Sequence, residues 1–259
     1  MNTSSRAAGI AALSVIAGGL ILQVSVYCFF PSSRSIYGPL QALAEIPGLF
    51  RNESLHSHAI ATILRTLGGF ILASVLGIVA GAVLGNLKPL RYFFMPLVDV
   101  ARPIPSAALI PVLVLIFGTS PISYYVAIVF GGLWPILLNA CASFSRREIS
   151  TELAIQQLRL SSLRRFVYIR LPAALPEIVT GMRVSVAICF ILSITAEIIV
   201  GRRDGIGFLM TQLDTGGNYA GMYGCLVILC VIGFTLNHLV ASIETRIPWL
   251  RNQYVSVDE

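Results

Sequence analysis

The chain has 259 residues, of which 56% are hydrophobic and only 12% are charged, and its mean hydropathy is +0.82. Soluble domains carry about 25% charged residues, so this composition excludes a water-soluble globular domain and indicates that lipid covers most of the surface. The net charge of +6 does not indicate nucleic-acid binding, because the basic residues lie between long apolar runs and no basic run interleaves aromatic residues. The five cysteines lie inside apolar stretches without a CxxC pair or a His/Cys ligand spacing, which predicts neither a disulfide nor a metal site.

Six apolar stretches are long enough to cross a hydrocarbon core of about 30 Å as helices. They lie near 8–30, 58–85, 92–117, 122–144, 177–200 and 220–242. The first stretch is too long for the core of a signal peptide and no small-residue cleavage pattern follows it, so we expect it to be retained as a span. The sequence therefore predicts an all-α polytopic membrane protein with about six transmembrane helices.

The distribution of lysine and arginine predicts the orientation of these spans. With the N-terminus inside, eleven basic residues fall in inner segments and four in outer segments, so we expect both termini in the cytoplasm. The first two spans are then joined by an outer loop, 31–57, with a short interfacial helix around Leu40 to Phe50. The predicted organisation is an N-terminal span and loop over 1–57, a core over 58–245 and a cytoplasmic tail over 246–259.

The third span contains several prolines, which remove backbone donors and clash with the preceding turn. They are Pro96, Pro103, Pro105 and Pro111. This span should therefore be kinked or split. Irregular backbone at membrane depth is tolerated only against protein or along a water-filled path, so the third span is a candidate pathway element.

Ionisable residues inside spans are costly and mark candidate functional sites. Asp99 and Arg102 are three residues apart and can pair on one helix face, either to hold the kink or to leave Arg102 facing an anionic substrate. Glu197 lies near the outer end of the fifth span, and we expect it to form an outer gate by pairing with an arginine rather than to contact the substrate directly. The candidate partners are Arg65, Arg202 and Arg203. Ser106 offers an uncharged hydrogen bond to a ligand, although small polar residues in spans more often hold helices together.

A basic cytoplasmic segment, 145–176, separates the fourth and fifth spans. Ser145 and Glu148 have capping-box spacing, which predicts a helix start there. The helix that follows places four residues on one face: Ile149, Leu153, Gln156 and Leu160. Ser161 or Ser162 offers the next N-cap, and a second short helix should run to Arg170 and end at the prolines that follow. The segment is either a docking element for a partner or an ordinary positive-inside loop.

The end of this segment resembles the cytoplasmic loop of type I ABC importer permeases. That loop has the pattern Glu-Ala-Ala, three residues, Gly, nine residues, Ile, one residue and Leu-Pro. Ile169–Pro172 matches its end, whereas at the other end only Ala154 agrees, Glu152 sits one residue early, and Arg159 stands at the glycine position.

Other motifs resemble the nitrate/sulfonate/taurine/bicarbonate group of these permeases, and together the similarity covers roughly 58–245. In the third span they are Arg102-Pro-Ile-Pro105, Ala107, Pro111 and Phe117-Gly118; elsewhere they are Gly77, Gly81, Ala196-Glu197 and Gly205-Ile206-Gly207.

The resemblance implies a permease in the inner membrane of a bacterium, paired with a second copy of itself, with two cytoplasmic ATPase subunits and an extracytoplasmic binding protein. ATP and Mg²⁺ would be used by the ATPase partners, since this chain has no P-loop; we expect it to be no enzyme and to bind no cofactor. The residues implied in coupling to the ATPase are Glu152, Ala154, Gln156, Arg159, Leu160, Ser161, Arg164, Leu171 and Pro172. Those of the translocation path or gate are Asp99, Arg102, Pro103, Pro105, Ser106, Glu197, Gly205 and Gly207. Arg159 either makes an ionic contact with an acidic residue of the ATPase or is an ordinary solvated arginine.

The expected cargo is a small anion of the sulfonate, taurine, nitrate or bicarbonate type. A pyrimidine or riboflavin-type vitamin precursor is the alternative within the same class. An ion-coupled secondary transporter should show broken helices in matching halves, and only the third span is clearly broken. An intramembrane enzyme would need ionisable residues converging at one depth, and none are evident from the sequence.

Overall fold

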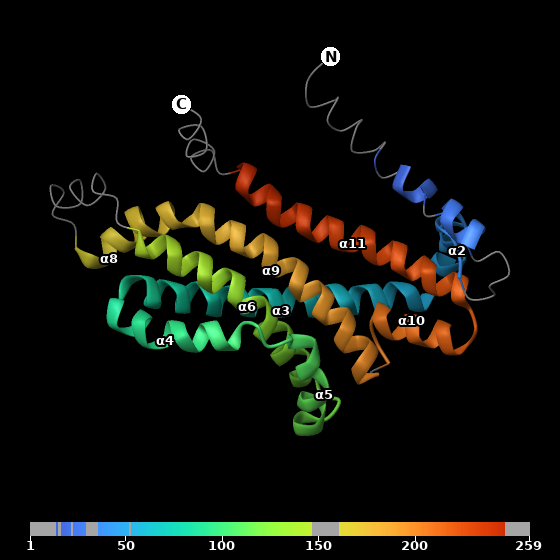
Figure 1. Cartoon of the computed structure of the whole chain (residues 1–259), viewed down its shortest axis with the longest axis horizontal. Coiled ribbons are helices and arrows are strands. Elements are labelled where there is room, and N and C mark those ends of the chain that lie inside the picture. Colours follow the sequence, from blue (N-terminus) through green and yellow to red (C-terminus); the bar gives the residue numbers. More distant parts are fainter. Residues whose placement is uncertain are drawn as a thin grey trace, which may run out of the picture.

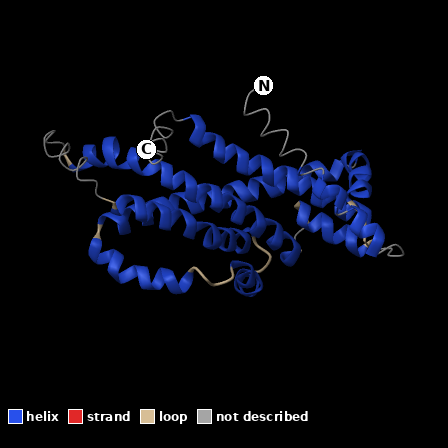
Figure 2. Cartoon of the chain, turned by 45° about the horizontal axis from the view of Figure 1, so that its top comes forward, coloured by secondary structure: helices blue, strands red, loops and turns tan. Residues whose placement is uncertain are grey.

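The computed structural model describes residues 14, 17–21, 23–29, 36–51, 53–146, 161–201 and 203–246. These residues form an elongated bundle of helices and contain no strand (Figures 1 and 2). Four long helices make up the bundle: α3 (Glu53–Asn86), α6 (Pro121–Ser145), α9 (Leu171–Val200) and α11 (Tyr219–Arg246). The predicted all-α membrane fold is confirmed.

Four helices are long and apolar enough to cross a membrane, or five if the bent pair described below counts as one span. The sixth span, expected near 8–30, stays a prediction. The described part of that stretch contains a shorter apolar helix over Ala17–Phe29, and the remainder lies outside the described residues. The short helix expected in the outer loop is present as α2 (Pro39–Arg51).

Helices α3 and α6 pack closely because small residues line the face that α3 turns toward α6. The stripe has a four-residue period and consists of Gly69, Ala73, Gly77, Gly81 and Gly85. A Cβ at Gly81 would lie 2.8 Å from the carbonyl oxygen of Leu137 in α6, closer than real Cβ contacts. Such small-residue stripes let two helix backbones approach each other within a membrane.

The third span is split into α4 (Lys88–Ala101) and α5 (Ser106–Phe117), whose axes are bent by 89°. The break lies at 102–105, so Pro103 and Pro105 cause it, whereas the other two prolines sit inside the helices. Figure 1 shows α4 beside α3 and α5 projecting away from the bundle. The prediction of a split span is confirmed.

Two expectations for the cytoplasmic segment were wrong. Ser145 is the last residue of α6 and no N-cap: its hydroxyl donates to the carbonyl oxygen of Cys141 at 2.5 Å, because α6 continues one turn past the expected end. The helix after Ser161 does not end at Pro172 either. Helix α8 (Ser162–Arg165) runs through a π-helical turn, η1 (Phe166–Arg170), directly into α9. The wide π-turn accommodates the proline that follows it without a break in the helix.

At the opposite end of the bundle, α2 and a short helix, α10 (Ile206–Thr215), pack against α3 and α11. Their shared apolar cluster consists of Leu49, Leu55, Ile206, Leu209, Cys225, Ile228 and Leu229. Helix α10 has 10 residues, too few to cross a membrane, and the sequence analysis did not predict it. It positions the turn that carries the ionic cluster described next.

Candidate functional site

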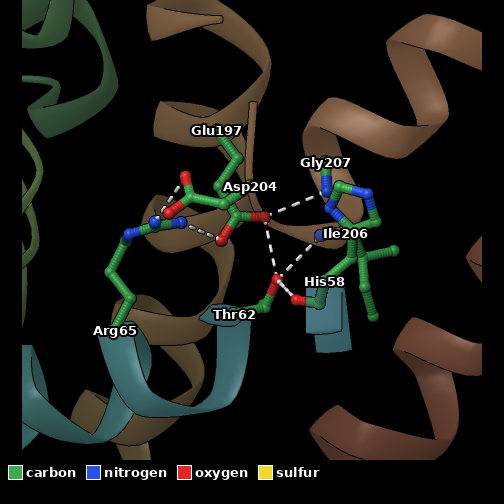
Figure 3. Close-up of polar contacts among 7 residues, drawn as sticks. All are labelled: His58, Thr62, Arg65, Glu197, Asp204, Ile206 and Gly207. Atoms are coloured by element: carbon green, nitrogen blue, oxygen red, sulfur yellow. Dashed lines mark hydrogen bonds and ion pairs between the residues drawn. The ribbon is translucent and has the colours of Figure 1, made fainter. Parts of the chain in front are cut away.

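A buried ionic cluster joins α3, α9 and the turn before α10 (Figure 3). Arg65 of α3 donates from Nη1 to Oε1 of Glu197 at 2.5 Å and from Nη2 to Oδ1 of Asp204 at 3.0 Å. The Arg65 side chain is 10% exposed and that of Glu197 is fully buried, whereas that of Asp204 is 39% exposed. Of the two candidate partners of Glu197 that the structure describes, Arg65 and Arg203, Arg65 pairs with it.

The second carboxylate oxygen of Glu197 is also satisfied. Oε2 accepts the backbone N–H of Gly207 at 3.0 Å and the hydroxyl of Thr62 at 3.0 Å. The same hydroxyl oxygen accepts the N–H of Ile206 at 2.9 Å. Two amides at the start of α10 are thus tied to α3 and α9, and the carboxylate lies at the positive end of the helix dipole.

Gly205 makes this approach feasible. Its φ is +103°, a conformation that side chains rarely adopt, and a Cβ there would collide with the Glu197 carboxyl group. A Cβ at Gly207 would lie 2.7 Å from the carbonyl oxygen of Ile194. The two glycines named as gate residues therefore form a close-fitting cradle around Glu197.

Arg65 also lies over the ring of Tyr124 in α6, with Cζ 4.3 Å from the ring centroid, as in a cation–π contact. The cluster thus connects α3, α6 and α9 with the start of α10, and Arg65, Thr62 and Glu197 each have more than one partner in it. This arrangement fixes the elements relative to one another. The role of Glu197 as an outer gate stays a prediction; of the other two arginines, Arg203 is exposed and Arg202 lies outside the described residues.

A second ion pair sits at the break of the third span. Asp99 Oδ1 and Arg102 Nη2 are 3.7 Å apart, so the i,i+3 pairing is present, and their side chains are 55% and 50% exposed. Pro103 and Pro105 beside them are exposed as well. Ser106 instead packs toward α6, where a Cβ on Gly131 would lie 2.9 Å from its Oγ. The structure thus separates Ser106, at a helix contact, from the exposed charges.

Polar contacts at the end of the bundle that holds the α3–α4 junction connect the helices near the segment 145–176. Arg170, in the π-turn, donates from Nη1 to Oδ1 of Asn86 at 2.5 Å, at the junction of α3 and α4. Arg91 bonds to Ser145, and Arg146 pairs with Glu177.

The residues assigned to ATPase coupling divide into two groups. Ser161 and Arg164 are exposed at the start of the α8–α9 helix, and Leu171 and Pro172 are partly buried where α9 begins. The others lie outside the described residues: Glu152, Ala154, Gln156, Arg159 and Leu160.

Sequence reasoning missed Thr62 and Asp204 in the ionic cluster and Asn86 at the α3–α4 junction. Thr62 lies one turn before Arg65 on α3, and this i,i+3 spacing of a hydroxyl and an arginine in an apolar span was the available signal.

Comparisons with known proteins show the family and the fold of the chain. Residues 73–248 match the family model described as binding-protein-dependent transport system inner membrane component. The chain is 27% identical over 233 residues to the taurine transport system permease protein TauC of Escherichia coli, covering 88% of this chain and 82% of that protein. It is 25% identical over 196 residues to the nitrate import permease protein NrtB of Leptolyngbya laminosa, covering 76% and 70%.

Among solved structures, a chain of the MetNI methionine ABC transporter in an inward-facing conformation superposes with a TM-score of 0.60 at 20% identity, covering 71% of this chain and 91% of that one. A chain of an amino acid ABC transporter with histidines gives a TM-score of 0.62 at 15% identity, covering 82% and 100%. These likenesses show a shared fold.

Proposed function

We propose that this chain, which belongs to the family of binding-protein-dependent transport system inner membrane components, forms the translocation path of an importer for a small anionic solute. The chain is a multi-pass inner-membrane protein and the permease subunit of an ABC importer, a transport component of a kind that carries no ATPase site of its own. The observation that carries the proposal is the family match, which spans 73–248 and thus most of the bundle.

The anionic character of the cargo is supported by the names of the relatives. They include permeases for taurine, nitrate, bicarbonate and aliphatic sulfonates, all of which are small solutes with an anionic group. An exposed arginine at the break of the third span fits such a cargo.

In the proposed assembly, two copies of the chain enclose the path, two cytoplasmic ATPase subunits hydrolyse ATP with Mg²⁺, and an extracytoplasmic binding protein delivers the solute. The segment 145–176 contacts the ATPase, and both termini lie in the cytoplasm. Because α8, η1 and α9 form one uninterrupted helix, a movement of Ser161 and Arg164 is carried along α9 toward Glu197 at its other end. ATP binding thereby biases a two-state element within the permease.

The test is reconstitution of the permease in proteoliposomes with its ATPase subunits and binding protein. ATPase turnover and solute uptake are measured with taurine, butanesulfonate, nitrate and bicarbonate, and with a pyrimidine and a riboflavin precursor as the alternative cargo. We expect one anion to stimulate both activities.

Two outcomes contradict the proposal at different levels. Stimulation by a vitamin precursor alone replaces the cargo and leaves the importer intact. Uptake that continues without ATP and stops when an ionophore collapses the ion gradient indicates an ion-coupled transporter instead.

A further inference from the structure

The ion pair at the break of the third span lies inside the membrane. Helix α4 starts at Lys88, two residues after the long membrane helix α3 ends at Asn86, and therefore starts near one face of the bilayer. Its 14 residues rise by about 21 Å. By the same rise α3 is about 51 Å long, and if it is centred on a hydrocarbon core of about 30 Å it overhangs each face by about 10 Å. Because α4 runs back beside α3 (Figure 1), Asp99 and Arg102 then lie about 6 and 11 Å inside the core, whichever face is cytoplasmic.

The ion pair and the break at 102–105 are not suited to contact with lipid. Both side chains of the pair are half-exposed in the isolated chain, and charged groups in contact with lipid at this depth are strongly unfavourable. Residues 102–105 add irregular backbone between two helices, which is tolerated at membrane depth only against protein or water. This face of the chain must therefore be covered by something other than lipid.

The pair itself is held loosely. The nitrogen–oxygen distance of 3.7 Å exceeds that of a hydrogen bond, and Arg102 has half of its side chain accessible. An anion approaching from the exposed side can therefore contact the guanidinium group, whose donors suit the oxygens of a sulfonate, nitrate or carboxylate.

We propose that Arg102 is the anion-binding group of the translocation path. The break at 102–105 faces water in a path enclosed by a second copy of the chain, and Asp99 holds Arg102 when no anion is present. This inference rests on the proposed function, because it places the anionic cargo at one residue of the permease.

The electrostatic potential at the break can be measured without knowing the cargo. Ile104 is 41% exposed within the break, and Ile104→Cys introduces a thiol there. The exposed native cysteines Cys28 and Cys230 are first replaced by serine, while the three buried ones are kept. The complete complex with its ATPase subunits, in proteoliposomes, is treated with an anionic and a cationic methanethiosulfonate reagent, with and without ATP.

A matched control separates water from lipid. Val231 is 61% exposed, apolar and close to the middle of α11, and we expect it to face lipid. Ile104→Cys should react with both reagents in at least one condition, and Val231→Cys with neither. No reaction of Ile104→Cys in either condition overturns the proposal.

The charge variants test the role of Arg102. The ratio of the anionic to the cationic reaction rate at Ile104→Cys should fall at least about fivefold with Arg102→Gln, because a unit charge nearby is removed. It should rise with Asp99→Asn and stay close to its original value with Arg102→Lys, which also controls for misfolding. A ratio that none of the variants changes, or that Asp99→Asn also lowers, overturns the proposal.

This result is independent of the uptake assay. If no anion in the panel is imported but the ratio responds as expected, the named solutes are wrong, and Arg102 still sets a positive potential in a water-filled path. If an anion is imported but the ratio does not respond, the importer stands and Arg102 is not its anion-binding group.

Discussion

The Arg65–Glu197 pair at one end of the bundle and the Arg102–Asp99 pair at the break of the third span use the same two chemical groups in opposite surroundings. Glu197 is fully buried and accepts three hydrogen bonds, whereas Asp99 is half-exposed and has one contact at 3.7 Å. Burial with every oxygen satisfied is what a structural pair requires, since any missing partner leaves an uncompensated charge. A group that binds a ligand transiently must instead be exposed and only weakly held by its partner in the protein. Burial and the number of bonds therefore distinguish the two roles better than residue type does.

The largest effect is expected from breaking the buried pair. Glu197→Gln removes the buried one of the two carboxylate charges that compensate Arg65, leaves only the partly exposed Asp204, and should lower the free energy of unfolding by about 3 kcal/mol. The measurement is thermal unfolding of the purified permease in detergent. Glu177→Gln is the matched control, because it makes the same change on the same helix in the exposed pair with Arg146. Equal stability of the two variants would show that the buried cluster does not hold the elements together.

The second effect concerns the close contact between α3 and α6. Gly81→Ala places a Cβ 2.8 Å from a backbone oxygen of α6, which cannot move aside as a side chain can, and should cost about 1–3 kcal/mol of unfolding free energy. Gly48→Ala in α2 is the control, since the nearest atom to its Cβ is 3.9 Å away. There the gain in helix propensity should leave stability unchanged or slightly higher. A stabilised Gly81→Ala would mean that the two helices are not packed as described.

Local chemistry explains which features could be predicted from the sequence. The break at Pro103 and Pro105 and the pairing of Asp99 with Arg102 depend only on neighbouring residues, and both are present. The partner of Glu197 lies 132 residues away, so only the packing of α3 against α9 could select it among three arginines.

The errors have the same origin. Ser145 has the spacing of a capping box, but α6 extends through it, because its packing on α3 continues to the last turn, where Gly85 meets Phe144. Helix α10 is short, and its position depends on contacts with α3 and Glu197 that no local pattern reveals.

A smaller effect is expected at the α3–α4 junction. Asn86→Ala removes the acceptor of Arg170 at the α3–α4 junction, and a partly buried bond to a charged donor should contribute about 1 kcal/mol. The measurement is a double-mutant cycle of unfolding free energies with Arg170→Gln, in which the pair should show a coupling energy of similar size. The control cycle uses Arg146 and Glu177, whose contact is mostly exposed. A larger coupling in the control cycle would contradict the assignment.

The smallest effect on stability is expected at the pair that we place in the path, and it decides what surrounds that pair. If water reaches Arg102, Asp99→Asn leaves a solvated arginine, and the free energy of unfolding should change by no more than about 0.5 kcal/mol. If lipid covers this face, the same change leaves an unpaired charge in hydrocarbon, at a cost of about 2.5–3.5 kcal/mol. Removing both charges with Asp99→Asn and Arg102→Gln should then stabilise the chain, whereas in water it should have little effect. The measurement is thermal unfolding of the assembled complex in lipid nanodiscs, because detergent would admit water to either face. A large loss in the single variant that the double variant restores would place the break against lipid and contradict the comparison of the two pairs.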